Sequence, residues 1–270
     1  MDNDRQPSRS LIGLPGAIII AAAILALAFI WIHKPTASSN TNNQQAATPS
    51  IDDQASGMAA VTNSDHILGN PQAPIKLVEY SDPSCPYCQM FNPTMEAIMN
   101  AYGPGGQVAW VYRQFPLDKP VTKGGPLFHP NSGREAAAFE CAGSIGGNSS
   151  FFAYMKHWFE IFPQNGADRT ETVDDAQIYQ AAKDIGLDMT AFNACESTGE
   201  FKDKLDQSYA DGINAGVTGT PYTILITPSG TRIPLEGAVA YSTLKSAIDT
   251  LITNMPAEIR TATSTVQFGQ

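Results

Sequence analysis

Residues 78–88 read "VEYSDPSCPYC" and carry two cysteines, Cys85 and Cys88, with two residues between them. The whole chain of 270 residues has four cysteines, so this spacing calls for an explanation. A zinc site needs about four ligands, and the sequence has neither a second Cys-x-x-Cys nor a His-x₃₋₅-His pattern. A structural staple across so short a loop contributes little stability. Redox chemistry, in which the pair opens and closes, is therefore the favoured interpretation.

The residues around the pair predict a strand, a helix and a second strand. Residues 75–80 are short and mostly apolar, as in a strand. Residues 108–115 are apolar at nearly every position, which is typical of a strand covered on both faces. Between them, apolar side chains recur at the spacing of one helical face, at Phe91, Met95, Ile98 and Tyr102. Together these segments form a βαβ unit with Cys85 and Cys88 where the first strand meets the helix.

A run of helices and a second set of strands follow. Residues 131–215 divide into amphipathic or glycine-terminated segments and are predicted to be helical throughout. Asp188 opens one of these helices, and Ser197 with Glu200 has the spacing of a capping box for the next. The remainder is predicted as a strand, an antiparallel partner and a closing helix, at residues 222–227, 231–237 and 241–252.

The start of a helix favours a reactive thiolate. Unpaired backbone N–H groups and the positive end of the helix dipole stabilise an anion there. Cys85 is expected in the first turn, with Ser84 as the N-cap and Pro86 tolerated because a first-turn N–H has no helical partner. Cys88 lies one turn deeper. We therefore expect Cys85 to be the exposed sulfur that exchanges with substrates and Cys88 to be the buried, resolving one.

The order of elements, with the cysteine pair and the segment "GVTGTPYTIL" at residues 216–225, resembles the DsbA-like thiol–disulfide oxidoreductase family. This resemblance implies an α/β thioredoxin fold, βαβ plus ββα, over residues 66–254, with a helical insertion at about residues 128–215. It also implies a cis peptide bond at Thr220–Pro221, facing the cysteines. Substrate would then contact four residues: Thr220, Pro221, Pro86 and Tyr87.

The resemblance assigns a further role to Glu79, in the strand before the pair. An acid at this place in DsbA-like proteins is buried beneath the resolving cysteine and moves its proton. An exposed strand residue is the alternative, and alternation only places Glu79 on the face of Leu77. Asp82 lies nearer the cysteines and is interpreted as turn chemistry. Tyr87 stands where DsbA enzymes often have histidine and brings no positive charge, which leaves a weaker oxidant or a reductase open.

Cys141 and Cys195 each lie in a predicted helix of the inserted block. A buried free cysteine is a common core residue. The extracytoplasmic side of a membrane is oxidising, however, and an even number of cysteines invites pairing. We therefore predict a structural disulfide between Cys141 and Cys195.

The N-terminal region predicts a membrane anchor. Residues 11–32 carry no charge, and a helix of about 20 apolar residues spans a bilayer. A cleaved signal peptide is the alternative, but its apolar core usually has about 7–15 residues. Arginines before the span place residues 1–10 in the cytoplasm. Residues 33–65 are polar and expected to be a flexible linker, and residues 255–270 form a C-terminal tail.

The predicted function is that of a single-pass protein of the bacterial cytoplasmic membrane with an extracytoplasmic catalytic domain. It would introduce disulfides into exported proteins that carry cysteine thiols, and a DsbB-like or quinone-linked membrane partner would reoxidise it. No metal or other cofactor is predicted. The net charge of −10 argues against nucleic acid as a partner. The alternatives are a reductase or isomerase kept reduced by a membrane electron donor, and a non-catalytic peptide-binding assembly factor.

Overall fold

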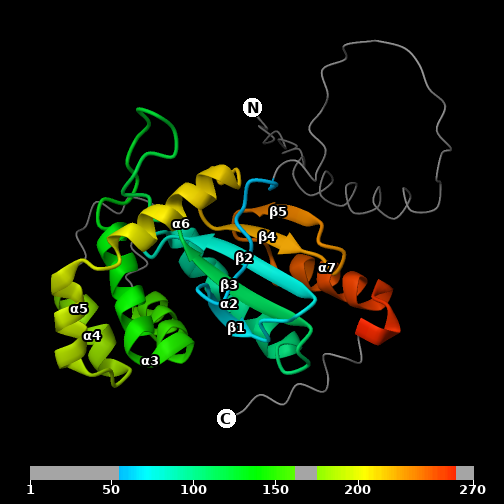
Figure 1. Ribbon diagram of the computed structural model, residues 1–270, viewed down its shortest axis with the longest axis horizontal. Coiled ribbons are helices and arrows are strands. Elements are labelled where there is room, and N and C mark those ends of the chain that lie inside the picture. The colour runs from blue at the N-terminus through cyan, green and yellow to red at the C-terminus, as the bar shows by residue number, and fades with distance from the viewer. Residues whose placement is uncertain (1–54, 162–174, 260–270) are drawn as a thin grey trace, which may run out of the picture. The chain divides into compact units, whose positions relative to one another are not determined.

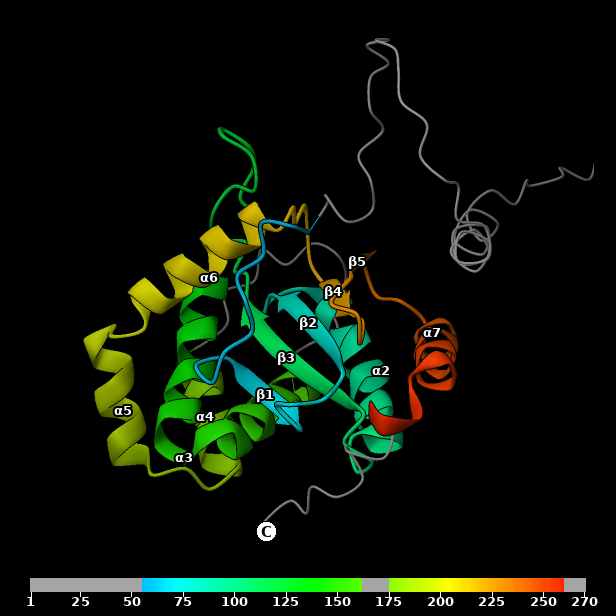
Figure 2. The same ribbon diagram turned by 45° about the vertical axis from the view of Figure 1, so that its right-hand side comes forward.

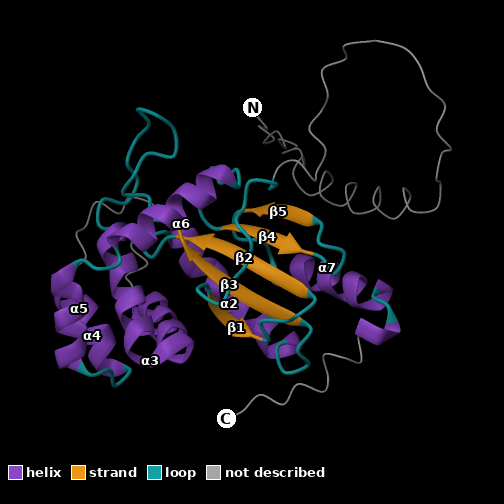
Figure 3. Cartoon of the chain, viewed as in Figure 1, coloured by secondary structure: helices purple, strands orange, loops and turns teal. Residues whose placement is uncertain are grey.

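The computed structural model describes residues 55–161 and 175–259 of the chain. A five-stranded sheet with the order β1-β3-β2-β4-β5 lies at the centre, and helices pack around it (Figures 1 and 3). Its strands are β1 (His66–Gly69), β2 (Ile75–Ser81), β3 (Val108–Gln114), β4 (Tyr222–Ile226) and β5 (Arg232–Glu236). The described helices are α2 (Pro86–Tyr102), α3 (Ser132–Ile161), α4 (Asp175–Asp184), α5 (Met189–Thr198), α6 (Lys202–Asn214) and α7 (Tyr241–Asn254).

The predicted βαβ unit is confirmed in the middle of the sheet. Strands β2 and β3 pair in parallel, and every residue of β3 is buried. The connecting helix α2 buries its apolar stripe and ends at Gly103. Strands β4 and β5 complete the sheet as an antiparallel hairpin next to β2. Cys85 and Cys88 therefore lie at the carboxyl end of the central strand, where helix α2 begins.

The inserted helical block is confirmed. Figures 1 and 2 show α3, α4 and α5 gathered at one side of the sheet and α7 at the other. The boundary between two of the predicted helical segments lies within α3, where Gly146 and Gly147 have non-helical backbone. Asp188 caps α5 as predicted, with its carboxylate accepting two backbone N–H bonds.

The capping box predicted at Ser197 and Glu200 is wrong. Ser197 still belongs to α5, and its hydroxyl donates to the carbonyl of Ala194. Helix α5 ends at Gly199, whose φ of 63° suits a residue without a side chain. Helix α6 begins after Phe201 with no side-chain cap.

Each face of the sheet carries its own apolar core. The face that includes Leu77 and Tyr112 packs against α2, α3 and α7, and its core includes both Cys85 and Cys88. The opposite face packs against Phe115, Val217 and the residues that precede β1. This explains why the strand residues are apolar on both faces.

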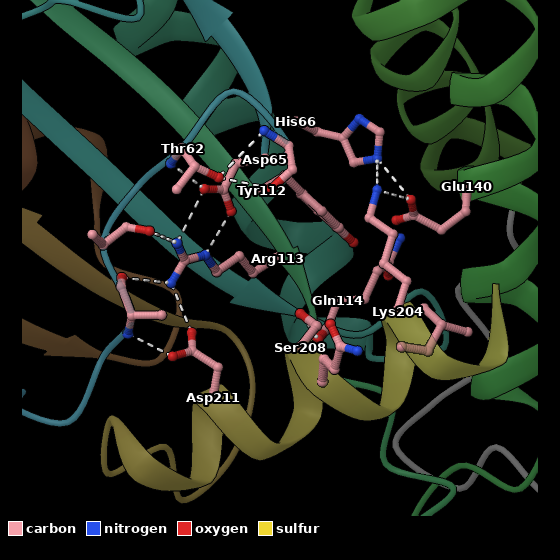
Figure 4. Close-up of a pocket in the computed structure, with 15 residues that line it drawn as sticks. Thr62, Asp65, His66, Tyr112, Arg113, Gln114, Glu140, Lys204, Ser208 and Asp211 are labelled. Carbon is pink, nitrogen blue, oxygen red and sulfur yellow. Dashed lines mark hydrogen bonds and ion pairs between the residues drawn. The ribbon is translucent and has the colours of Figure 1, made fainter.

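The flexible linker is predicted to extend to residue 65, but the structure shows that residues 55–65 belong to the folded domain. Ala55 and Met58 are buried in the second core. Arg113 fixes the same segment: its guanidinium bonds Asp65 at 2.8 Å and Asp211 at 2.7 Å, and also bonds the carbonyls of residues 59 and 60 (Figure 4). Strand β1, which the sequence analysis did not predict, follows directly and pairs with β3.

Cys141 and Cys195 form the predicted disulfide, which joins α3 to α5 with their Cα atoms 5.8 Å apart. Among the residues that the structure describes, no helix is long and apolar enough to cross a membrane. The predicted anchor at residues 11–32, the cytoplasmic residues 1–10 and most of the linker lie outside the described residues.

Candidate active site

Helix α2 begins one residue later than the sequence predicts. Cys85 is itself the N-cap, with extended backbone at φ −78° and ψ 121°, and Pro86 is the first helical residue. Ser84 does not cap the helix, because its hydroxyl donates to Glu135 of α3 at 2.6 Å. Two more hydrogen bonds join the start of α2 to α3. The Gln89 side chain donates to the carbonyl of Phe159, and the Trp158 indole donates to the carbonyl of Pro83. The helical insertion thus holds the cysteine pair in place.

The structure brings the predicted site residues together across the sheet. Both Cys85 and Cys88 are present as thiols. The Cys85 Sγ donates to the carbonyl oxygen of Thr220 at 3.4 Å. The Thr220–Pro221 bond is cis, as the resemblance implied. The cis-proline loop, far away in sequence, therefore lies directly beside the first cysteine.

Cys85 is less exposed than predicted. Only 3% of its surface is accessible, against 1% for Cys88. The carbonyl of Thr220 lies against its sulfur, and the Trp158 side chain of α3 donates to the Pro83 carbonyl in the preceding turn. Tyr87 lies between the two cysteines and is 55% exposed. The accessible surface at this end of α2 is therefore the Tyr87 side chain rather than a sulfur.

The pKa values of the two thiols are shifted in opposite directions. A hydrogen bond from the Cys88 thiol is the main cause that lowers the pKa of Cys85 to about 7, and the backbone N–H of Cys88 in the first helical turn acts in the same direction. Burial raises the pKa of Cys88 well above its ordinary value, and the neighbouring Cys85 and Glu79 raise it further. Near pH 7 Cys85 is therefore about half ionised, while Cys88 keeps its proton.

Glu79 is the buried acid that the resemblance implied. It is 2% exposed, and burial raises its pKa from 4.5 to about 7. Its side chain lies on the face of β2 that also carries Leu77, and this is the face whose core contains both cysteines. The charge on Glu79 also raises the pKa of Cys88. The carboxyl can therefore be neutral or charged near pH 7, as a proton carrier must be.

Asp82 is a site residue that the sequence analysis underrated. Its side chain is fully buried, and its backbone N–H donates to the Cys88 sulfur at 3.4 Å. One carboxylate oxygen accepts the Ser84 N–H, which is the predicted turn chemistry. The other accepts the Leu117 N–H at 2.7 Å and a bond from His129. The sequence signal was an acid three residues before the first cysteine, at the end of a fully buried strand.

No group of three or more His, Cys, Asp or Glu side chains that could hold a metal ion occurs among the described residues.

The sequence matches the thioredoxin family profile over residues 61–250. The chain belongs to the thioredoxin family. Among curated proteins, this family member is 31% identical over 129 residues to Na(+)/H(+) antiporter NhaA 1 of Mycobacterium sp. strain KMS. That match covers 48% of the chain and only 18% of the antiporter, so it concerns a small part of the relative.

Several solved structures share the fold. Pseudomonas aeruginosa DsbA2 is 24% identical, with a TM-score of 0.53 over 73% of this chain and 99% of that one. Wolbachia pipientis alpha-DsbA1 is 23% identical, with a TM-score of 0.57 over 71% and 92% of the two chains. Oxidised BdbD from Bacillus subtilis is 18% identical, with a TM-score of 0.58 over 70% and 94%. The thioredoxin fold with a helical insertion is thus the DsbA-type fold.

The acidity difference predicts selective alkylation. In the reduced protein, iodoacetamide should modify Cys85 first, with a rate that reaches half its maximum near pH 7, because the thiolate is the nucleophile. Mass analysis after a short pulse across pH 5–10 measures both sites, and a Cys85→Ser variant serves as the control for Cys88. Equal labelling of the two cysteines, or a midpoint near pH 9, would contradict this assignment.

The raised pKa of Glu79 predicts a pH-dependent stability. Between pH 4.5 and about 7 the folded protein keeps a proton that the unfolded chain has lost, so stability falls as pH rises through this window. Glu79→Gln removes the effect and should gain about 3 kcal/mol relative to the parent between pH 4 and pH 8. Urea unfolding of both proteins with Cys85 and Cys88 oxidised excludes the thiols from the comparison. A difference that does not change with pH would show that Glu79 ionises at its ordinary pKa.

Proposed function

We propose that the protein is a membrane-anchored thiol–disulfide oxidoreductase of the DsbA type, which introduces disulfides into exported proteins. One observation carries the proposal: Cys85 has a lowered pKa and Cys88 a raised pKa, at a helix start beside the cis Thr220–Pro221 bond. A structural disulfide needs no such difference in acidity. An exchange site needs it, because one sulfur must leave or attack as a thiolate while the other stays protonated.

The reaction starts from the oxidised pair. A substrate thiolate attacks Cys85, forms a mixed disulfide with it and breaks the Cys85–Cys88 bond. The electron pair of that bond leaves with Cys88, which takes the proton of Glu79. The second substrate thiol, deprotonated, then attacks the substrate sulfur of the mixed disulfide and expels Cys85 as a thiolate. The substrate loses two electrons and gains a disulfide, and the enzyme pair gains the two electrons.

Substrate would be held as an extended peptide beside the cis-proline loop. The backbone of Thr220 lies next to the Cys85 sulfur and can pair with a substrate strand. Pro86 and the exposed Tyr87 form the opposite border of the site. Because Cys85 is 3% exposed, an incoming sulfur would have to approach between this border and the loop.

The reduced enzyme must pass its two electrons on. A DsbB-like or quinone-linked membrane protein is the proposed acceptor, and the predicted anchor at residues 11–32 would keep the domain within reach of it. The catalytic domain would lie on the extracytoplasmic side, where exported substrates emerge and where the Cys141–Cys195 disulfide is stable.

A reductase or isomerase is the second candidate, and two observations favour it. Tyr87 contributes no positive charge between the cysteines. The pKa of Cys85, about 7, is lower than that of a free thiol but resembles that of thioredoxin, a reductant, more than that of the strong oxidant DsbA, about 3.5. Direction is set by the reduction potential, which depends on how well the protein stabilises the reduced pair.

The reduction potential of the Cys85–Cys88 pair separates the two candidates. Equilibration with glutathione buffers should give a value well above the roughly −270 mV of thioredoxin and toward the roughly −120 mV of DsbA. A Cys88→Ser variant should at the same time trap exported proteins as mixed disulfides at Cys85, and Cys85→Ser should trap none. A potential at or below that of thioredoxin, with a membrane electron donor trapped on Cys88→Ser, would support the reductase instead.

The proposed role of Glu79 predicts a kinetic effect. When Cys88 leaves or attacks within a mixed disulfide, Glu79→Gln can neither give nor take its proton, so the intermediate should live longer. Stopped-flow oxidation of a dithiol peptide by variant and parent measures this step, and Thr223→Val, a change at the buried position paired with Glu79 on β4, is the control. Unchanged kinetics from pH 5 to pH 8 would mean that Cys88 exchanges its proton with water.

A further inference from the structure

Asp82 is buried at the active site, where a negative charge is costly. None of its surface is exposed, and its backbone N–H donates to the Cys88 sulfur. Its carboxylate accepts two backbone N–H groups, from Ser84 at 2.6 Å and from Leu117 at 2.7 Å. Its charge raises the pKa of Cys85. Asp82 therefore opposes the thiolate on which the proposed reaction depends.

The charge on Asp82 also acts on other titratable groups nearby. Asp118 and Tyr112 each have a raised pKa, caused mainly by burial and in part by the charge on Asp82. Glu135 of α3 is connected to the same turn through the Ser84 hydroxyl and is also buried. Two buried acids so close together, Asp82 and Glu135, are costly unless hydrogen bonds or a positive charge compensate them.

His129 is placed to supply that charge. Its Nδ1 donates to the second carboxylate oxygen of Asp82 at 3.0 Å, and its side chain is 12% exposed. The backbone on both sides of the contact is fixed, since the His129 N–H donates to the Leu117 carbonyl and the Ser132 hydroxyl donates to the His129 carbonyl. Leu117 itself donates to Asp82. The imidazole is thus held against the carboxylate by its own loop.

We propose that His129 is a positioning residue that, as an imidazolium, neutralises Asp82 and so relieves the repulsion between Asp82 and the Cys85 thiolate. The inference rests on the proposed function, for which it identifies the source of positive charge. Tyr87 offers no positive charge between the cysteines. His129 supplies it from the loop before α3 and acts on the sulfur through the Asp82 carboxylate that it contacts. The reduced form of the pair is stabilised as a result, which makes the oxidised pair a stronger oxidant.

The first test is His129→Gln, which keeps a hydrogen-bond donor but cannot carry charge. The ratio of thiolate to thiol at Cys85 should fall by roughly three- to tenfold at a pH below the titration midpoint. Thiolate absorbance at 240 nm, followed against pH in the reduced protein with a Cys85→Ser blank, measures this ratio. The reduction potential of the same variant should move toward that of a weaker oxidant. An unchanged Cys85 titration in a folded His129→Gln protein would overturn the proposal.

The second test separates charge compensation from a merely structural contact. Asp82→Asn removes the repulsion at its source, so it should restore the thiolate ratio that His129→Gln lowers and change the ratio little where His129 is present. In the Asp82→Asn background, His129→Gln should then change the ratio less than twofold. Equal effects of His129→Gln in both backgrounds would overturn the proposal, as would a ratio lowered by His129→Gln that Asp82→Asn fails to restore.

His157→Gln is the matched control. His157 also bonds an aspartate, Asp184, but on the surface of the helical block, so its replacement should leave the Cys85 titration unchanged. The rate at which the parent protein oxidises a dithiol peptide is recorded in the same series. A parent that does not exchange disulfides at all would refute the proposed function, whereas the coupling of Cys85 to Asp82 and His129 is read from the titrations alone.

Discussion

Three ionisable side chains, Cys85, Cys88 and Glu79, are buried together on one face of the sheet, where each negative charge is costly. This constraint orders the chemistry of the site. A charge on Cys85 is stabilised by the thiol of Cys88, and the same charge raises the pKa of Cys88. Glu79 keeps its proton to about pH 7 because it is buried in the same core. A proton gained at one position is therefore coupled to the charge at the others.

The rest of the fold serves to place these groups. Parallel pairing of β2 with β3 brings the end of the central strand to the start of α2, so that Cys85 becomes the N-cap. The hairpin of β4 and β5 brings the Thr220–Pro221 bond to the same edge. The helical insertion closes the turn before the cysteines through hydrogen bonds from α3. Loss of any of these contacts would leave the thiols without a defined environment.

Much of this arrangement could be predicted from the sequence, because it depends on local patterns. Apolar runs fixed the central strands, and the spacing of Phe91 and Met95 fixed the buried face of α2. The cysteine pair and the Gly-Thr-Pro segment located the two halves of the site. Glu79 could be placed on the correct face of its strand, but its burial followed only from the resemblance.

The features that were missed depend on contacts between distant segments. Cys85 is buried because Thr220 covers it, and no local pattern shows this. Residues 55–65 resemble a linker in sequence. The residue that holds them, Arg113, lies in a buried strand about 50 positions further along the chain. Asp82 looks like an ordinary turn residue, and its bond to His129 spans 47 positions of the chain. Such polar pairs leave no periodic signal in a single sequence.

The central claim is that burial in one core couples the ionisation of Cys85, Cys88 and Glu79. An NMR titration of the reduced protein, with ¹³C-labelled cysteine Cβ and glutamate Cδ, observes all three groups in one sample from pH 4 to pH 10. The account predicts that Cys85 and Glu79 titrate near pH 7, each curve broadened by the other, and that Cys88 keeps its proton well above pH 9. Three independent transitions at the ordinary values for free cysteine and glutamate would contradict it.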